Sequence, residues 1–594
     1  MNVIATVMCF GLVAATVVIS FYSRRFNQTT AEFYLAGRRV GFIANASAIC
    51  GDYFSAASFL GVAAAIYAGG LDGVWFGAGF GAGFVPVVLF FASPLRRFGE
   101  YTLPDFLTAR FESATVRIVA VALVELICLL YLAPQLLAVG HVWEILVGPG
   151  ISGLSPYATG VIVMTMLMVF YAALGGMRGT TWNQVVQFWV LTTAMLLVVL
   201  LTVSYTVQYG NAIGKASESL LVAPVVYRVR DLPVGEARAV MSAEYWEREV
   251  APRLSDPEAT VVVLMPVRSK LTGGTVRFTE PGSRYNWLTQ FSVVITLIVG
   301  TSGLPHIMNR FYTNPSGSVA RITTVYILGF VAFFYTLAGV AGVLGRALVP
   351  GLSQTFQGAG TLGRAIDGVL ANPDGLVPFL AQSLGGDVGL GYVAAGALAA
   401  ALSTMGGLVI AAAASWGHDL YEKYINPAAS ERRKVAVVRA AVVTIALVGM
   451  AAGLGIPALG LDRAYPELIA LMVTWAFGVA GGGFFPVLFM GIWWRRTTTR
   501  GALAGMVVGG FGSALFISGN ILAATWKASP AWIQLTGSLT FPAVITVPLS
   551  FAAIIIVSLM DQDNIPANID AIWGRIHGTA KERMEARRAA RFSS

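Results

Sequence analysis

Two adjacent hydroxyl residues, Ser403 and Thr404, lie near the middle of an apolar segment rich in alanine, glycine and leucine. In a helix, such hydroxyls usually donate to the carbonyl four residues earlier. Two hydroxyl oxygens beside a backbone carbonyl also form the hard oxygen set that an alkali cation prefers. The pattern therefore leaves two interpretations open, a back-bonded helix or part of a cation site.

Asp52 is the most unusual residue of another apolar segment, Gly41–Gly69. It lies about eleven residues into the segment, which at 1.5 Å per residue is ~16 Å deep and near the middle of a bilayer. An acid there costs at least ~2.5–3.5 kcal/mol on insertion scales. We therefore treat Asp52 as a candidate functional residue, with a structural pair across a helix interface as the alternative. The neighbouring Gly51 and Ser55 permit a local break in the helix.

A third segment, Trp287–Phe311, contains Gly300, Gly303 and Pro305 in its second half. Proline donates no backbone hydrogen bond and glycine weakens a helix, so we expect a break there, with a simple kink as the alternative. This segment is the seventh apolar segment of the chain and the Asp52 segment is the second. Broken helices in corresponding positions of two halves point to the binding site of an inverted-repeat transporter.

The candidate substrate-binding residues lie in or near these breaks. The sequence places no lysine or arginine near the centre of the broken segments. We therefore expect a substrate carboxylate to be held by free N–H groups at half-helix N-termini. Polar residues that could line such a site are Asp52, Tyr53, Gln135, Thr301 and Ser302.

Composition sets the elements that must position these residues. Of 594 residues, 56% are hydrophobic and 12% are charged, about half of the ~25% that a soluble domain carries. We predict an all-α polytopic membrane protein of about thirteen helices. The predicted spans are Asn2–Tyr22, Gly41–Gly69, Gly73–Phe91, Val116–Val139, Tyr157–Leu174, Val185–Val207, Trp287–Phe311, Ile322–Leu344, Val388–Trp416, Val435–Leu454, Leu468–Trp493, Ala502–Leu522 and Phe541–Met560.

Basic residues predict the orientation. When the spans alternate, the loops that contain Arg24, Arg96, Lys423 and Arg495 fall on one side, which the positive-inside rule assigns to the cytoplasm. The N-terminus is then outside and the basic tail inside. The first span has no small-residue cleavage site and is expected to be retained. The net charge of +9 lies in these loops, which argues against nucleic acid as a partner.

One polar stretch, Gln208–Asn286, interrupts the spans on the predicted outer side. It mixes charges of both signs and contains two strand-like pieces, Thr260–Met265 and Thr275–Thr279. We expect a small folded extracytoplasmic insert. The chain has four histidines and no clustered metal ligands or nucleophile–base pair in its sequence pattern, which argues against an enzyme and against a cofactor.

Five motifs resemble those of the sodium:solute symporter family. They are Gly51–Gly61, Tyr101–Phe106, Leu174–Met177 with Thr181, Trp182 and Gln187, Gly303–Ile307 with Arg310 and Phe311, and His418–Tyr421. Within the family, the chain is most similar to bacterial cation/acetate symporters. The resemblance extends from the first span to the last, apart from the insert.

The resemblance implies two inverted five-helix repeats, with one extra helix before them and two after. Together with the polar stretch and the basic tail, it divides the chain into these parts: residues 1–40 with the first helix, 41–207 and 287–493 as the repeats, 208–286 as the insert, 494–560 with two peripheral helices, and 561–594 as a cytoplasmic tail. It further implies sodium as the coupling ion. The residues around that ion would be the carbonyls of Gly51, Phe54 and Ala400 and the hydroxyls of Ser403 and Thr404.

The function expected from this resemblance is sodium-coupled import of a small monocarboxylate, with acetate first, across a bacterial cytoplasmic membrane. Other small solutes, such as pyruvate, propionate or proline, are the alternative within transport. A transport-like membrane sensor is a further alternative, against which the absence of a signalling module after Met560 argues. The expected partners are the solute, sodium and the lipid bilayer, with no nucleic acid and no obligate protein partner.

Overall fold

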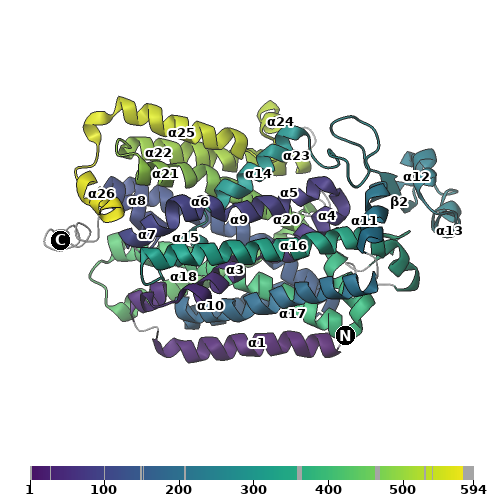
Figure 1. Cartoon of the computed structure of the whole chain (residues 1–594), viewed down its shortest axis with the longest axis horizontal. Helices are drawn as coiled ribbons and strands as arrows, with labels where there is room; N and C mark the ends of the chain where they lie inside the picture. The colour runs from purple at the N-terminus through teal and green to yellow at the C-terminus, as the bar shows by residue number, and fades with distance from the viewer. Residues whose placement is uncertain are drawn as a thin grey trace.

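The computed structural model describes residues 3–26, 29–99, 101–146, 150–151, 153–206, 209–356, 364–461, 468–526, 530–537 and 539–578. Long helices run side by side along the longest axis, and a small mixed unit lies at one end of them (Figure 1). The bundle is held together by apolar side chains, and its central helix, α17 (Leu376–Ala414), is buried on all sides along most of its length.

The other helices of the bundle come in the following order along the chain. They are α1 (Val3–Ser23), α3 (Phe42–Tyr53), η3 (Ala57–Gly61), α4 (Val62–Gly69), α5 (Leu71–Ala82), α6 (Phe84–Pro86), η4 (Val87–Phe91), α7 (Ala92–Phe98), α9 (Ala114–Leu146), α10 (Pro156–Tyr205), α14 (Trp287–Thr301), α15 (Pro305–Phe311), α16 (Gly317–Thr355), η9 (Ser415–Ile425), α18 (Glu431–Ala458), α20 (Leu468–Gly483), α21 (Phe485–Trp493), α22 (Thr499–Met506), η10 (Val507–Phe511), α23 (Gly512–Thr525) and α25 (Ala543–Met560). Shorter helices outside the bundle are α2 (Thr30–Leu35), α8 (Leu103–Phe111), α24 (Ala531–Gly537) and α26 (Ile569–His577).

The number of membrane spans depends on how the long helices are divided. Eleven helices in the described part of the chain are long and apolar enough to cross a bilayer, or up to twelve if the bent pair of Phe42–Tyr53 and Ala57–Gly69 is one span. The 50-residue helix α10 would be ~75 Å long if straight, more than twice the ~30 Å hydrocarbon core. It is interrupted at Gly176 (φ 54°, ψ −163°), between the predicted fifth and sixth spans. The count of thirteen stays a prediction.

Both segments predicted to break are interrupted, and the bend is large only at the first, because Trp287–Phe311 still qualifies as one span. The chain bends by 73° between Phe42–Tyr53 and Ala57–Gly69. The second break separates α14 from α15, which begins at Pro305 as proline favours. At this break Gly303 lies so close to α20 that a Cβ would come within 2.1 Å of the Ala480 carbonyl oxygen. The close packing of α20 therefore requires a glycine at the second break.

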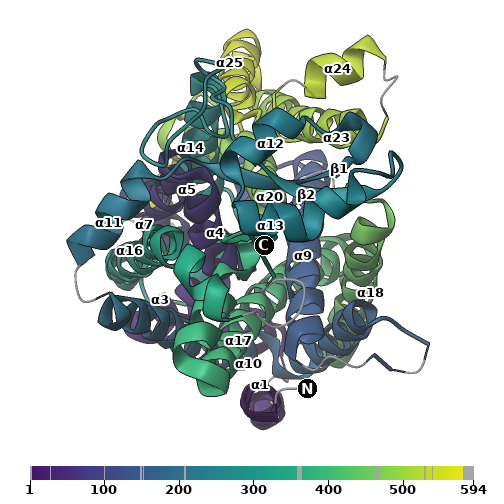
Figure 2. The same cartoon turned by 90° about the vertical axis from the view of Figure 1, so that its right-hand side faces the viewer.

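The insert is a folded unit with a small core of its own. Strand β1 (Val222–Arg228) pairs antiparallel with β2 (Thr260–Pro266), and the register runs from Val222 opposite Pro266 to Arg228 opposite Thr260. Three helices accompany them: α11 (Tyr209–Glu218), α12 (Val234–Val240) and α13 (Ala243–Tyr245). Figure 2 shows these elements over one end of the bundle. The insert core includes Trp246 and Val263, together with Ile366 and Val369 from the hairpin β3 (Ala365–Ile366)–β4 (Val369–Leu370) that precedes α17.

The predicted strand Thr275–Thr279 is wrong. Only isolated bridges form in this region, Arg268 with Thr275 and Leu220 with Arg277. The chain turns just before it at Gly273, whose φ is 77°. Each end of the short piece therefore pairs with a different segment, and no continuous ladder forms.

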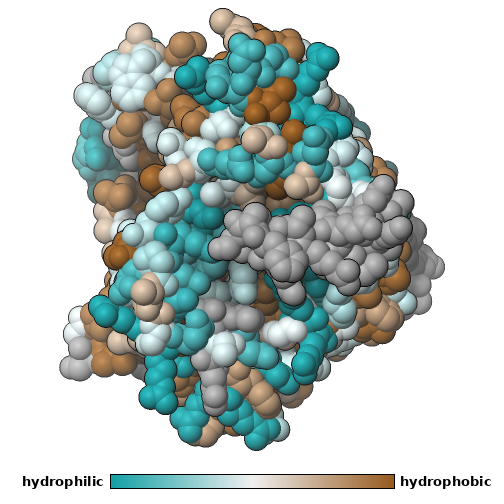
Figure 3. All heavy atoms as spheres, turned by 90° about the vertical axis from the view of Figure 1, so that its left-hand side faces the viewer, coloured by the Kyte–Doolittle hydropathy of each residue, from teal (hydrophilic) through white to brown (hydrophobic). Residues whose placement is uncertain are grey.

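The two ends of the bundle differ as the sequence predicts. Helix α1 begins at the end that carries the insert, and α26 lies at the other end (Figures 1 and 2). Three predicted basic loops meet near α26: Arg38 donates to the Gly99 carbonyl at 2.6 Å, and Arg495 pairs with Asp570. Figure 3 shows hydrophilic side chains over this face. That it faces the cytoplasm stays a prediction, and the tail residues after 578 lie outside the described residues.

Candidate functional site

The hydroxyls of Ser403 and Thr404 on α17 face the broken end of α3. Ser403 Oγ lies 2.5 Å from the Gly51 carbonyl oxygen, and Thr404 Oγ1 lies 2.7 Å from the Asp52 carbonyl oxygen. Both hydroxyls also approach the Ala400 carbonyl oxygen, at 2.9 and 3.2 Å. The structure thus brings together four of the five residues predicted for the sodium site.

This group can hold a hard monovalent cation. It offers five neutral oxygens, from two hydroxyls and three carbonyls, and the side chains of Ser403 and Thr404 are 1% and 0% exposed. Neutral oxygens at short mutual distance suit sodium. Each hydroxyl keeps lone pairs while it donates its hydrogen, so it can ligate an ion and bind a carbonyl at once.

The Phe54 carbonyl stays a predicted ligand, and the observed contacts add another group. Thr404 reaches the Asp52 carbonyl, which the sequence analysis did not include. Phe54 ends α3 with its N–H bonded to the Cys50 carbonyl at 2.7 Å. The bend begins at this residue, and its direction decides which carbonyls face α17.

The Asp52 side chain is paired with an arginine. Arg310 Nε on α15 lies 3.3 Å from Asp52 Oδ2, and both side chains are at most 1% exposed. The expectation that no side-chain cation lies near the broken helices is therefore wrong, because Arg310 is near the end of its span in sequence but reaches back to Asp52. The close approach of α17 shapes this pair, since a Cβ on Gly407 would come 2.0 Å from Asp52 Oδ1.

The same arginine connects to α10 and to the predicted sodium site. Its other nitrogens donate to Thr181 Oγ1 at 2.7 Å and to the side-chain oxygen of Gln184. The Gln184 amide in turn donates to the Ser403 carbonyl at 2.8 Å. Neither α10 residue was predicted as a site residue, although Thr181 belongs to a motif that the sequence analysis singled out.

The four other predicted substrate residues lie around the two breaks. Tyr53 Oη lies 2.9 Å from Thr301 Oγ1 and donates to the Phe80 carbonyl at 3.0 Å. Gln135 on α9 accepts a hydrogen bond of 3.0 Å from the N–H of Ala56, which follows the α3 break. Tyr53 and Thr301 thus join the two broken helices directly, and Gln135 joins the first of them to α9.

Several buried polar atoms in this region have no hydrogen-bond partner among the described residues. They are Gln135 Nε2, Ser302 Oγ and both ring nitrogens of His306, whereas the hydroxyls of Tyr131 and Ser55 bond each other. The Tyr131 and His306 rings lie edge to face with centroids 5.5 Å apart. Tyr131 and His306 were not predicted as site residues, although their positions in the sequence indicate both. Tyr131 precedes Gln135 by one helical turn, and His306 follows the helix-breaking Pro305.

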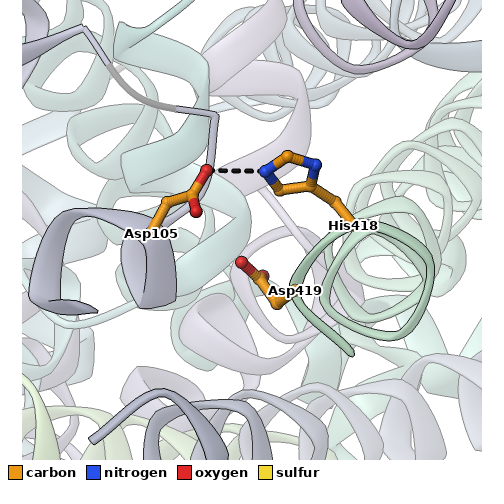
Figure 4. Close-up of side chains that lie close together, drawn as sticks. All are labelled: Asp105, His418 and Asp419. Atoms are coloured by element: carbon orange, nitrogen blue, oxygen red, sulfur yellow. Dashed lines mark hydrogen bonds and ion pairs between the residues drawn. The ribbon is translucent and has the colours of Figure 1, made fainter. Parts of the chain in front are cut away.

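A third polar cluster lies at the end of the bundle opposite the insert. Asp105 on α8 points toward His418 and Asp419 on η9 (Figure 4). Nε2 of His418 lies 2.7 Å from Asp105 Oδ2, and one nitrogen of Arg117 contacts Asp105 at 2.8 Å and Asp419 at 2.9 Å. Burial alone would raise the pKa of Asp105, but the hydrogen bond from His418 and the charges of His418 and Arg117 hold that pKa below 3.8. Because Arg117 supplies the positive charge, we interpret the cluster as an ion-pair network that joins α8, α9 and η9.

Two broken membrane helices around buried oxygen atoms define a secondary transporter of the inverted-repeat type. The family model of the sodium:solute symporter family matches residues 33–509, and the chain belongs to this family. It is 28% identical over 574 residues to the uncharacterized symporter YwcA of Bacillus subtilis (strain 168), with 95% of each chain covered.

A solved structure confirms the fold class. The substrate-bound, outward-open state of a sodium-coupled sialic acid symporter superimposes with a TM-score of 0.63 and 17% identity, over 94% of this chain and 98% of that one. The predicted family and fold are therefore confirmed. The family and this structural neighbour are transporters rather than enzymes, and they support sodium-coupled symport across a membrane.

Proposed function

We propose that this protein is a sodium-coupled symporter that imports a small monocarboxylate, with acetate as the leading candidate. The observation that carries the proposal is the contact of Ser403 and Thr404 with the carbonyls of Gly51 and Asp52. An ion bound there contacts both the intact helix α17 and the broken helix α3. Sodium binding then favours one geometry of the break over others. Such a dependence of the conformation on the bound ion is what ion coupling requires.

The break carries the coupling from sodium to the solute. Gly51 and Asp52 lie on its sodium side, and Ala56 lies on its other side with its N–H on Gln135. A change in the bend therefore moves the Ala56 N–H relative to Gln135. The positive N-terminal end of the second half-helix suits a carboxylate.

The donors near the breaks favour a small anion. Gln135 Nε2 and Ser302 Oγ are buried and have no partner among the described residues, so a carboxylate could accept from them. The Tyr131 hydroxyl nearby is bonded to Ser55 and could turn to donate to the same carboxylate. The one arginine nearby already has Asp52 as its counter-charge. Aromatic rings enclose the region, with Phe477 5.8 Å from Tyr131 and 6.0 Å from Tyr53 between ring centroids. Such packing suits a solute of a few heavy atoms, and the resemblance to acetate symporters agrees.

The test is uptake of radiolabelled acetate by purified protein in liposomes, with and without an inward sodium gradient. We expect sodium-dependent accumulation that propionate and pyruvate reduce less than unlabelled acetate does. Tyr131→Phe should weaken acetate uptake, whereas Tyr157→Phe should not, because the Tyr157 hydroxyl bonds the Gly453 carbonyl away from the breaks. Accumulation of proline but not acetate would contradict the substrate, and accumulation without sodium would contradict the coupling.

A further inference from the structure

The guanidinium of Arg310 is held by the kinds of oxygen that bind an alkali cation. Its three partners are the Asp52 carboxylate at 3.3 Å, the Thr181 hydroxyl at 2.7 Å and the side-chain oxygen of Gln184. All four side chains are buried, with at most 2% exposed. A carboxylate, a hydroxyl and an amide oxygen together are also a set of hard ligands for sodium.

This second oxygen group is continuous with the proposed sodium site. Asp52 contributes its carboxylate to Arg310 and its backbone carbonyl to Thr404. Gln184 contributes its oxygen to Arg310 and its amide N–H to the Ser403 carbonyl. The Arg310 guanidinium therefore lies beside the proposed sodium site, and the two groups share Asp52 and Gln184.

We infer that Arg310 is a built-in cation that replaces a second sodium ion, so the carrier binds one sodium per cycle. The inference rests on the proposed function, and it specifies its ion stoichiometry. Asp52 and Arg310 cancel in charge, which leaves one sodium and one monocarboxylate as a neutral load. Without the charge of Arg310, Asp52, Thr181 and Gln184 become free to bind a second sodium.

The experiment counts bound sodium on purified protein without any solute, using ²²Na⁺ in a scintillation proximity assay. Wild type should bind one ion per chain with a Hill coefficient near one. Arg310→Met removes the charge and keeps much of the volume, and it should bind two ions. Arg310→Lys keeps a charge at the same place and should bind one. The double variant Asp52→Asn with Arg310→Met removes the carboxylate that attracts the second ion and should return to one.

The outcomes separate the inference from the proposed function. Two sodium ions on wild type would overturn the inference and leave sodium coupling intact, whereas no bound sodium would overturn both. A folded Arg310→Met protein that still binds one ion would also overturn the inference. If that variant is not folded by size-exclusion chromatography, the wild-type count tests the stoichiometry, and two bound ions overturn the inference.

A second measurement uses transport. In liposomes with a clamped membrane potential, wild-type uptake of acetate should not respond to the potential, because its load is neutral. Uptake by Arg310→Met should rise with an inside-negative potential, since two sodium ions and one acetate carry one net charge. Uptake by wild type that depends on the potential as steeply as two ions per acetate demand would contradict a single sodium site.

Discussion

Replacing Thr404 with alanine removes one of five oxygens from the proposed sodium site. The hydroxyl lies 2.7 Å from the Asp52 carbonyl oxygen and 3.2 Å from that of Ala400, so it is fixed between the two helices that the ion would bridge. A lost ligand to a charged group costs ~1.5–3 kcal/mol. At about 1.4 kcal/mol per decade, the sodium concentration for half-maximal uptake should rise roughly ten- to hundredfold. Thr404→Ser keeps the oxygen and should change it far less.

The assay is sodium-dependent acetate uptake in liposomes, at equal amounts of reconstituted protein. Thr324→Ala is the matched control, because this buried threonine donates only to Ala320 within its own helix α16, at 3.0 Å. It should leave the sodium dependence unchanged. If Thr404→Ala and Ser403→Ala both keep the wild-type sodium dependence, the two hydroxyls merely clamp α17 to α3, and the sodium site lies elsewhere.

Three other predictions test other parts of the structure. Gly407→Ala should abolish most uptake, because its Cβ would meet the Asp52 carboxylate at 2.0 Å. Gly478→Ala is the control and should behave as wild type, because its Cβ would have its nearest atom at 3.7 Å. Equal uptake by the two variants would contradict the close packing at Gly407. Arg117→Gln should lower the melting temperature in detergent, since the buried Asp419 loses the cation that it contacts, at a cost of ~3–5 kcal/mol, while Asp105 keeps only His418; an unchanged melting temperature would contradict that role. A cysteine in place of Ser242 should react with an impermeant maleimide on intact cells, because the described native cysteines are buried; labelling only after lysis would reverse the orientation.

The helix breaks and the sodium group were predictable because their causes are local. Glycines and a proline in an apolar segment weaken a helix wherever it lies, and both breaks occur where such residues gather. Ser403 and Thr404 stand out because hydroxyls are conspicuous in a run of alanine and leucine. That their partners include Gly51 came from the resemblance to a family, since spacing along the chain says nothing of which helix packs opposite.

The contacts between distant segments were not predictable in this way. Arg310 was expected to lie away from the centre of the membrane, because it is close to the end of its span in the sequence. A long arginine side chain can reach several ångströms back along its helix, which the position in the sequence does not show. The position of Asp52 could have indicated Arg310 as its partner, because a buried acid needs a counter-charge and arginines are rare in the spans. The contact of Thr404 with the Asp52 carbonyl depends on the direction of the 73° bend, which no sequence pattern encodes.

The pairing of Asp52 with Arg310 has a consequence for how the protein is made. The two residues are 258 positions apart, so at about 5–20 residues per second the arginine leaves the ribosome roughly 13–50 s after the aspartate. During this interval the second span must enter the bilayer with an acid that has no partner, or wait beside the translocon until the seventh span arrives. Chains truncated before residue 310 should therefore integrate the second span poorly, and changing Asp52 to asparagine should correct that defect in the truncated chain.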